Sequence, residues 1–461
     1  MSGHALLSGA YRRRFLILLF FVCLFNLADR AVFSVMAPLM RAELHLTDGQ
    51  IGILQGLSFA LLYGGLGLPV GWLADRYSRV RIIAIATAIW SAATTASGLA
   101  TSYSQMLLTR VCVGMGEAGF TAPTSSLVAD HFPPQRRASA MGVIILGLPV
   151  GTIIGAVGGG FVGQHFGWRA AFFVLGIPGL VVALLAAWLL REPPRGLADA
   201  ALDANAARGA AAVPTPAGAR AEGPSLGSVF RHLFTSPVLR NVVIGGSICS
   251  IGIQGVAQFM PLFFVRTFDM PIREAATLFG LVSGGSLAVG LLAGGFGTDR
   301  AAQRDVRWHA LGPAIALVVT PVLFVIGFGQ STVTPTVVLL VGGCIGAMIH
   351  YGPTVGVIQN RTPVAMRSTA AAIFAMFYAL SGTGIGPTFV GIASDHLAAL
   401  AFDGNYAQVC APGRTAADAA AACGAAARHG LSRALMLCVL AYGWGAVHYF
   451  LAARALGRER R

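Results

Sequence analysis

Long apolar runs dominate the chain, and each is about as long as a helix needs to cross a membrane. A helix rises 1.5 Å per residue, so about 20 apolar residues cross a hydrocarbon core of roughly 30 Å. The pattern predicts twelve such helices and therefore an all-α membrane protein. They lie near residues 14–40, 50–72, 81–100, 104–129, 139–163, 170–190, 238–265, 275–297, 308–328, 335–358, 368–392 and 432–456.

The apolar pattern is broken for a long stretch between residues 191 and 236. This stretch begins with Glu192-Pro-Pro-Arg195 and continues with many alanines and further prolines. Such a composition is typical of a flexible linker. The sequence thus predicts a six-helix bundle over 1–190, a cytoplasmic linker over 191–236 and a second six-helix bundle over 237–461. A long polar loop from Ser394 to Leu431 is expected before the last helix.

Composition supports a membrane protein and assigns its orientation. The chain is 56% hydrophobic and only 11% charged, whereas soluble domains carry about 25% charged residues. The 32 basic residues are all arginine, and most of them flank the side of the membrane that carries both termini. That asymmetry is the positive-inside rule, so we expect an integral inner (plasma) membrane protein with both termini in the cytoplasm. The net charge of +14 therefore indicates topology and no nucleic-acid partner.

The absence of lysine and the cysteine spacing exclude several kinds of chemistry. A Walker A loop needs a lysine on the nucleotide phosphates, so this route of ATP hydrolysis is excluded and an ion gradient or substrate flow must drive any pumping. Cys410 and Cys423 lie close together in the polar loop, without the second pair of ligands that a zinc site needs. They form either a disulfide or two free thiols. We expect no metal and no cofactor.

Four ionisable side chains interrupt the apolar runs of the first half. Asp29 and Arg30 fall near the middle of the first predicted helix, and Arg110 and Glu117 lie in the fourth. Charges at that depth cost several kcal/mol unless they meet partners or water, and such residues are commonly functional. They either form structural ion pairs that join helices or make a polar core that binds and moves a solute, and we favour the second interpretation.

A loop motif of the first half recurs in the second half. Gly71-Trp-Leu-Ala-Asp75-Arg76 is repeated as Gly295-Phe-Gly-Thr-Asp299-Arg300. Parallel six-helix repeats are the build of the major facilitator superfamily, and the first copy, which continues to Arg79, resembles that superfamily's signature loop. The resemblance implies a conformational lock formed by Gly71, Asp75, Arg76, Arg79, Asp299 and Arg300.

Within that superfamily, residues 12–195 resemble the Spinster-like branch. The matching phrases include Asn26-x-x-Asp29-Arg30, Leu46-Thr-Asp-Gly-Gln-Ile-Gly52, Arg110 to Gly119 and Gly167-Trp-Arg-Ala-Ala-Phe172. The resemblance implies export of sphingosine-1-phosphate or lysophospholipids, as in animal members, or of amphipathic drugs with protons, and it implies a monomer. The organic-anion:cation symporter branch also carries Asp-Arg in helix 1 and Arg-x6-Glu in helix 4, so a sugar-acid carrier stays open.

The second half differs from the first because its predicted spans contain no acid or base except His350. A substrate with one charged head and an apolar tail needs charge on one wall and apolar groups on the other, and this pattern favours an amphipath. Aromatic residues at helical spacing fit core packing equally well. The candidate lining residues are Gln254, Gln258, Phe259, Phe263, His350, Tyr351, Phe374, Phe377, Tyr378 and Ser381.

These residues suggest a mechanism in which proton and substrate share one arginine. Burial and neighbouring arginines act in opposite directions on the proton affinity of a carboxyl, so a mid-membrane acid can load and release a proton as its surroundings change. We expect Glu117 to carry the proton, with Asp29 as a second titrating or orienting site. Arg30 and Arg110 are the candidate head-group ligands, although Arg110 also suits an ion pair with either acid.

The sequence therefore predicts a proton-coupled secondary transporter for an anionic, lipid-like amphipath or an amphipathic drug, working by alternating access. The alternative is a sugar-acid:proton symporter of the same superfamily. An enzyme is not expected, because His-Glu-x-x-His is absent and arginines beside the two acids disfavour a shared proton. A passive channel is not expected, because it would need a hydrophilic stripe along several helices and the sequence has none. A non-transporting receptor is a further alternative, which counterflow of a labelled substrate would exclude.

Overall fold

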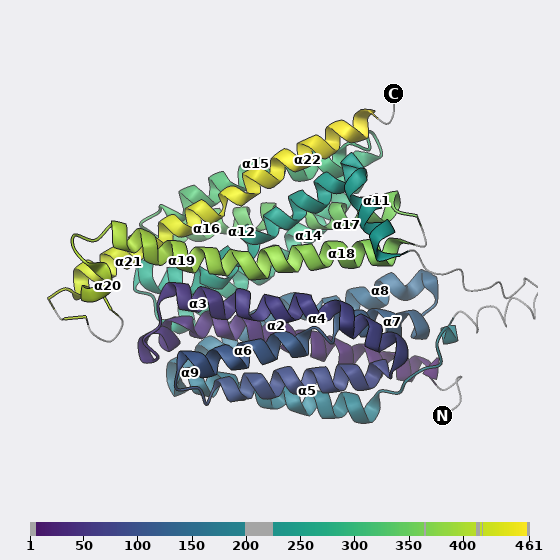
Figure 1. Ribbon diagram of the computed structural model, residues 1–461, viewed down its shortest axis with the longest axis horizontal. Coiled ribbons are helices and arrows are strands. Elements are labelled where there is room, and N and C mark those ends of the chain that lie inside the picture. Colours follow the sequence, from purple (N-terminus) through teal and green to yellow (C-terminus); the bar gives the residue numbers. More distant parts are fainter. Residues whose placement is uncertain (1–5, 199–224, 364–365, 412–414, 417, 459–461) are drawn as a thin grey trace, which may run out of the picture.

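The computed structural model describes residues 6–198, 225–363, 366–411, 415–416 and 418–458. Five side chains fall outside the described part as well: those of Leu68, Asp75, Pro134, Ala138 and Ser368. Every regular element among the described residues is a helix, and these helices form two halves (Figure 1).

The first half contains six membrane crossings, several of them broken within the span. In chain order its helices are α2 (Gly9–Glu43), α3 (Asp48–Gln55), α4 (Leu57–Arg76), α5 (Arg79–Ser97), α6 (Tyr103–Glu117), α7 (Thr121–His131), α8 (Pro134–Ile145) and α9 (Gly147–Leu189). The pairs α3 and α4, and α6 and α7, each make up one crossing. α9 is interrupted at Gly167, whose φ of +82° is a conformation that glycine adopts without strain.

The second half has the same number of crossings. Its elements are α11 (Leu226–Thr235), α12 (Pro237–Phe268), α13 (Ile272–Phe279), η1 (Gly280–Gly285), α14 (Ser286–Ala302), α15 (Trp308–Phe328), α16 (Val333–Met348), α17 (Tyr351–Arg361), α18 (Arg367–Ala379), η3 (Leu380–Ile385), α19 (Gly386–Leu400), α20 (Tyr406–Val409), α21 (Ala420–Cys438) and α22 (Leu440–Arg458). η1 and η3 are π-helical turns inside long helices, a feature that often marks functional sites.

Ten helical runs among the described residues are long and apolar enough to cross a membrane. One of them, Gln135–Leu189, has 55 residues, about twice the length of one crossing, and contains the interruption at Gly167. The helices α6 and α7, with 15 and 11 residues, supply the remaining crossing together. The all-α membrane fold predicted from the sequence is confirmed.

Two stretches predicted as irregular are helical. The end of the predicted linker forms α11, because Ser225 caps its first turn and Val229 and Leu233, one helical turn apart, are buried against the second half. The expected loop after Ser394 is shorter than predicted: α19 continues to Leu400, and an alanine-rich stretch begins α21 at Ala420. Alanine has the highest helix propensity, which favours this early start.

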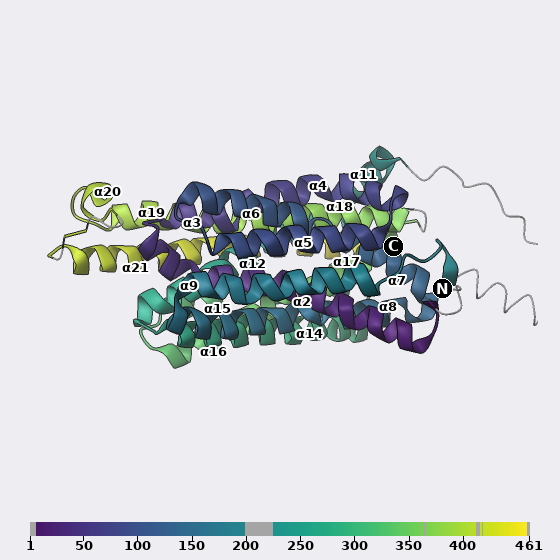
Figure 2. The same ribbon diagram turned by 90° about the horizontal axis from the view of Figure 1, so that it is seen from below.

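The two halves meet at one end of the molecule and diverge toward the end that carries both termini (Figure 1). We call these the opposite end and the termini end. At the opposite end α3 packs against α19, and a Cβ on Gly391 would lie 2.2 Å from the carbonyl oxygen of Asp48. Only glycine allows the two backbones to approach this closely. Within the first half, α9 packs along both α2 and α5 (Figure 2).

Candidate functional site

Arg30 and Glu117 form an ion pair between α2 and α6. The Arg30 guanidinium donates to a single carboxylate oxygen, Oε2, at 3.0 Å from Nε and 2.5 Å from Nη2. The Glu117 side chain is fully buried, and its second oxygen, Oε1, has no hydrogen-bond partner among the described residues. The Arg30 guanidinium also stacks over the ring of Phe59 at 4.3 Å and that of Tyr63 at 5.3 Å.

Asp29 and Arg110 form a second, looser ion pair between the same two helices. Arg110 Nη1 lies 3.6 Å from Asp29 Oδ2, and both side chains are about 95% buried. Arg110 also donates to Ser97 Oγ at 3.2 Å and lies over the Phe33 ring at 4.6 Å. Neither carboxylate oxygen of Asp29 accepts a hydrogen bond within the described chain. The structure thus brings all four predicted ionisable residues together in two pairs.

A small hollow connects these pairs with the second half. Its volume is about 20 Å³, room for about one water. Arg30 and Arg110 line it from the first half, and Gln258 and Thr383 line it from α12 and η3. Ser34 of α2 contacts Gln258, and Gln254 donates to Thr383 at 3.1 Å. The predicted polar residues of α12 therefore face the arginines across the junction of the halves.

A larger cavity of about 670 Å³ lies between the halves, and the helices that line it lie toward the termini end (Figure 1). Its walls are mostly apolar and come from α4, α7, α17 and α18, and no charged residue lines it. Tyr63 contributes to the wall and is also one of the two rings that stack on Arg30. A single aromatic ring thus joins an uncharged cavity to a buried ion pair.

The predicted lining residues differ in how close they lie to the large cavity and the small hollow. Tyr351 and Phe374 line the large cavity, and Gln258 lines the small hollow. Gln254 reaches that hollow through Thr383, while Tyr378 packs against Tyr351 and Phe374 behind the cavity wall. Ser381, half-buried in η3, lines neither space.

The remaining candidate lining residues line neither space in this conformation. Phe259 and Phe263 are fully buried in the core of the second half, where Phe263 packs on Phe328. His350 is fully buried with Nδ1 on the carbonyl of Ala347. Phe377 packs on α11, which lies within the predicted linker. Aromatic spacing alone does not distinguish a cavity wall from a packed core.

A polar cluster at the opposite end was not found from the sequence. Asp48 is buried there and accepts from Arg266 of the second half at 2.7 and 2.8 Å and from Ser394 at 2.7 Å. Arg41, in the same half as Asp48, adds a contact at 3.1 Å. Asp395 accepts from the backbone N–H groups of Asp48 and Gly49 at 3.1 and 2.7 Å. We call Asp48, Arg266, Ser394 and Asp395 the outer latch, because it holds α3 against α12 and α19.

Sequence signals for the outer latch were present but weak. Thr47 and Gln50 form a capping box at the start of α3, which fixes the backbone around Asp48. Asp48 and Arg266 lie at the ends of their predicted membrane spans. Charged residues are expected at such positions, so their presence alone does not indicate a function.

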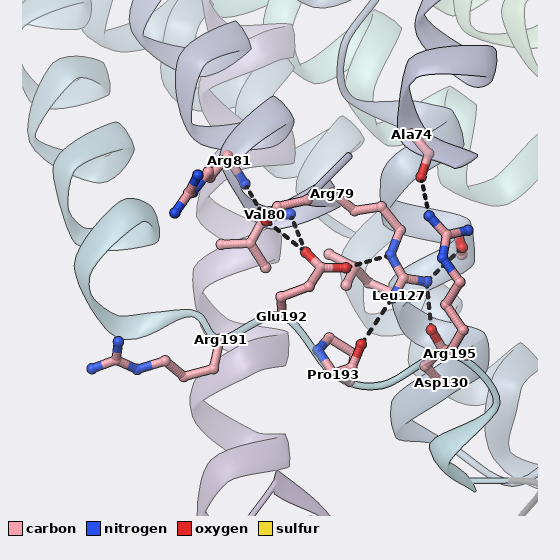
Figure 3. A network of polar contacts seen from close by, with 12 residues as sticks. Ala74, Arg79, Val80, Arg81, Leu127, Asp130, Arg191, Glu192, Pro193 and Arg195 are labelled. Carbon is pink, nitrogen blue, oxygen red and sulfur yellow. Dashed lines mark hydrogen bonds and ion pairs between the residues drawn. The ribbon is translucent and has the colours of Figure 1, made fainter. Parts of the chain in front are cut away.

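The signature loop forms a polar network inside the first half (Figure 3). Arg79 is buried and contacts Glu192 at 2.7 Å, Asp130, Ser126 at 2.8 Å and the carbonyl of Pro193. Arg195 reaches the carbonyl of Ala74 at 2.8 Å. The network joins the start of α5 to α7 and to the segment after α9.

Glu192 holds that network as an ionised carboxylate. Burial alone raises the pKa of Glu192, but hydrogen bonds from the Val80 N–H, Arg79 and Ser78 outweigh burial and hold this pKa below its ordinary value.

The other predicted lock residues make no contact across the halves within the described part of the chain. Gly71 has open space around it, and Arg76 stacks on Trp72 of its own helix at 3.7 Å. Asp299 lies 3.7 Å from His309 and is largely exposed, and Arg300 is exposed. The side chain of Asp75 lies outside the described residues. In this conformation the described side chains of the repeated loops therefore do not join the two halves.

Cys410 and Cys423 form a disulfide with a Cα–Cα distance of 5.5 Å. The bond ties the segment after α20 to the start of α21 at the opposite end of the molecule. Among the described residues there is no cluster of His, Cys, Asp or Glu that could hold a metal ion.

Comparison with known proteins gives a consistent family assignment. The model of the Major Facilitator Superfamily matches residues 19–387. A protein of Mycolicibacterium smegmatis described as an MFS-type efflux pump is 31% identical over 81% of this chain and 82% of its own length. A hexuronate transporter of Bacillus subtilis is 32% identical over 39% of this chain and 42% of its own length.

A solved structure is similar over the whole chain. It is a bacterial homologue of the human lysosomal transporter Spinster, in an inward-facing and unoccupied conformation. The two chains are 28% identical, superpose with a TM-score of 0.83, and match over 98% of this chain and 99% of the other.

Proposed function

Because this chain belongs to the Major Facilitator Superfamily and is a Spinster-like member of it, we propose that it is a proton-coupled transporter for an anionic amphipath. The substrate class is a lysophospholipid, a sphingoid phosphate or an amphipathic drug. The mechanism is alternating access of a monomer, with both termini in the cytoplasm.

One observation carries the substrate class. The large cavity has mostly apolar walls and no charged lining residue, and it ends at Tyr63, which stacks on the Arg30 of the buried ion pair. An apolar tail fits the cavity, and a phosphate head fits a forked guanidinium. The volume of about 670 Å³ lies within the range of small-molecule sites.

The ion pair supplies the coupling in this proposal. Ionised Glu117 occupies Arg30, so a substrate head group and the carboxylate compete for one guanidinium. Protonation of Glu117 at its unpartnered Oε1 removes that competition, because a neutral acid holds Arg30 less strongly. Asp29 orients Arg110 through their ion pair. The closed outer latch and the cavity on the termini side correspond to a state open to the cytoplasm.

A second candidate is a sugar-acid:proton symporter, favoured by the similarity to the hexuronate transporter of Bacillus subtilis. A sugar acid has no tail, so it would bind to the polar groups Gln258 and Thr383 beside the arginines in a conformation in which the small hollow is wider, and it would leave the apolar cavity unfilled.

Thermal shift of the purified protein distinguishes the two candidates. We expect sphingosine-1-phosphate or lysophosphatidic acid, below its micelle concentration, to raise the melting temperature, and glucuronate to have no effect. Ala375→Trp fills the cavity and should remove the lipid effect, whereas Leu184→Trp, on an exposed lipid-facing position, should preserve it. Stabilisation by glucuronate that survives Ala375→Trp would favour the sugar-acid carrier.

A further inference from the structure

Three arginines surround a separate hollow at the termini end of the second half. The hollow has a volume of about 410 Å³ and lies between the first turn of α12 and the last turns of α22. Arg240 lines it from α12, and Arg454 and Arg458 line it from α22, together with Asn241 and Leu451. It shares no residue with the large cavity, and α22 runs along the face of the second half that is turned away from the first half (Figure 1).

The three arginines have no acidic partner among the described residues. No ion pair or side-chain hydrogen bond joins any of them to another described group. Arg307, which reaches the same end of α22 beside Gly457, is already paired with Asp305 at 2.8 Å. Like charges four residues apart on a helix, as at Arg454 and Arg458, repel each other. A hollow built in this way favours an anion between the guanidinium groups.

An exposed apolar stripe leads along α22 into the hollow. Trp444, Val447 and Leu451 follow one another at spacings of three and four residues, are 62%, 54% and 42% exposed, and are followed on the same face by Arg454 and Arg458. In a membrane protein such a stripe faces the acyl chains of the bilayer. Apolar contact along the helix thus continues directly into positive charge at its end.

We propose that this hollow is a binding site for the phosphate head group of one anionic glycerophospholipid from the leaflet at the termini end. Its acyl chains lie along Trp444, Val447 and Leu451, and its phosphate lies between Arg240, Arg454 and Arg458. Because the phosphate contacts both α12 and α22, the lipid holds together the first and last helices of the second bundle. The site is independent of the transported substrate, since it lies outside the cavity between the halves.

The test compares lipids and two matched triple variants. Native mass spectrometry and thermal shift are measured on the full-length protein in a neutral detergent, with phosphatidylglycerol or with phosphatidylcholine of the same acyl chains. We expect one retained phosphatidylglycerol and a higher melting temperature with this lipid than with phosphatidylcholine. Arg240→Gln/Arg454→Gln/Arg458→Gln should weaken phosphatidylglycerol binding about tenfold or more, since each basic residue contributes to anionic-lipid binding.

The control variant removes the same charge from the same end of the molecule. Arg13, Arg14 and Arg81 are exposed there and line neither this hollow nor the large cavity, so Arg13→Gln/Arg14→Gln/Arg81→Gln should retain the lipid. Equal loss in the two triple variants would mean general surface charge and would overturn the proposal. Sodium phosphate that stabilises the protein as well as phosphatidylglycerol would mean a free-anion site and would also overturn it. If the first triple variant does not fold, Arg454→Gln and Arg458→Gln are measured singly, and unchanged lipid binding in both overturns the proposal.

Discussion

The guanidinium of Arg30 donates two hydrogen bonds to one oxygen of Glu117, and the other oxygen of that buried carboxylate has no partner among the described residues. Buried polar atoms are nearly always hydrogen-bonded in folded proteins. This oxygen gives a proton a place to bind, and the neutral acid then holds the arginine less strongly.

Glu117→Gln should remove the pH dependence of transport and keep substrate binding. Glutamine has the shape of a protonated glutamate, so Arg30 is permanently available to the substrate. The measurement is uptake of a fluorescent lysophosphatidic acid into proteoliposomes between about pH 5.5 and 8. Glu43→Gln is the matched control, because Glu43 pairs with Arg169 at the opposite end and should keep the wild-type pH profile. A normal pH response of Glu117→Gln would disprove the proposed coupling role.

Arg266→Gln should open the opposite end of the molecule. Arg266 is the arginine that reaches Asp48 from the other half, so its loss removes the ion pair across the outer latch. Spin labels at Leu99→Cys and Leu400→Cys, in a background without the five unpaired cysteines, report the separation of the halves there. We expect a larger population of long distances.

Arg41→Gln is the control for the outer latch. Arg41 contacts the same carboxylate at 3.1 Å but lies in the same half as Asp48, so its loss should leave the distance distribution unchanged. The same widening in both variants would show that the charge of Asp48, and not the connection between the halves, keeps this end closed.

Glu192→Gln should destabilise the protein at neutral pH and have little effect in acid. The folded protein holds the pKa of Glu192 below the value of about 4.3 expected for an unfolded chain. Its stabilisation is therefore fully present above about pH 4.3 and is lost as pH falls through the lower folded pKa. Melting temperatures of wild type and variant from pH 7 down to pH 3 check this. The difference should shrink toward acid, whereas Glu274→Gln, at an exposed position, should show no such trend.

Labelling of cysteines should reveal the disulfide and its side of the membrane. In denatured protein a maleimide reagent should modify five of the seven cysteines without reductant and all seven after reduction, because Cys410 and Cys423 are joined. A reductant that does not cross membranes should release this pair in intact spheroplasts if the opposite end faces outward. Release only after lysis would reverse the proposed orientation of the termini.

The sequence alone determined the membrane fold and the four ionisable residues of the candidate site. Twelve apolar runs leave few alternatives, since a helix satisfies its own backbone hydrogen bonds within a bilayer. Asp29, Arg30, Arg110 and Glu117 stood out because charge in the middle of an apolar run is costly. Their partners could not be derived, because the pairing depends on how α2 and α6 are rotated against each other, and that rotation is a property of packing.

Tertiary structure alone decided which aromatic residues face the cavity and which residues close the opposite end. Phe259 and Tyr351 look alike in a helical pattern, but Phe259 is packed in the core and Tyr351 lines the cavity. Asp48 and Ser394 lie 346 residues apart in the chain and meet because the backbones of α3 and α19 approach closely at Gly52 and Gly391. A sequence pattern indicates which face of a single helix is apolar, whereas a contact between two bundles depends on the relative position of both bundles.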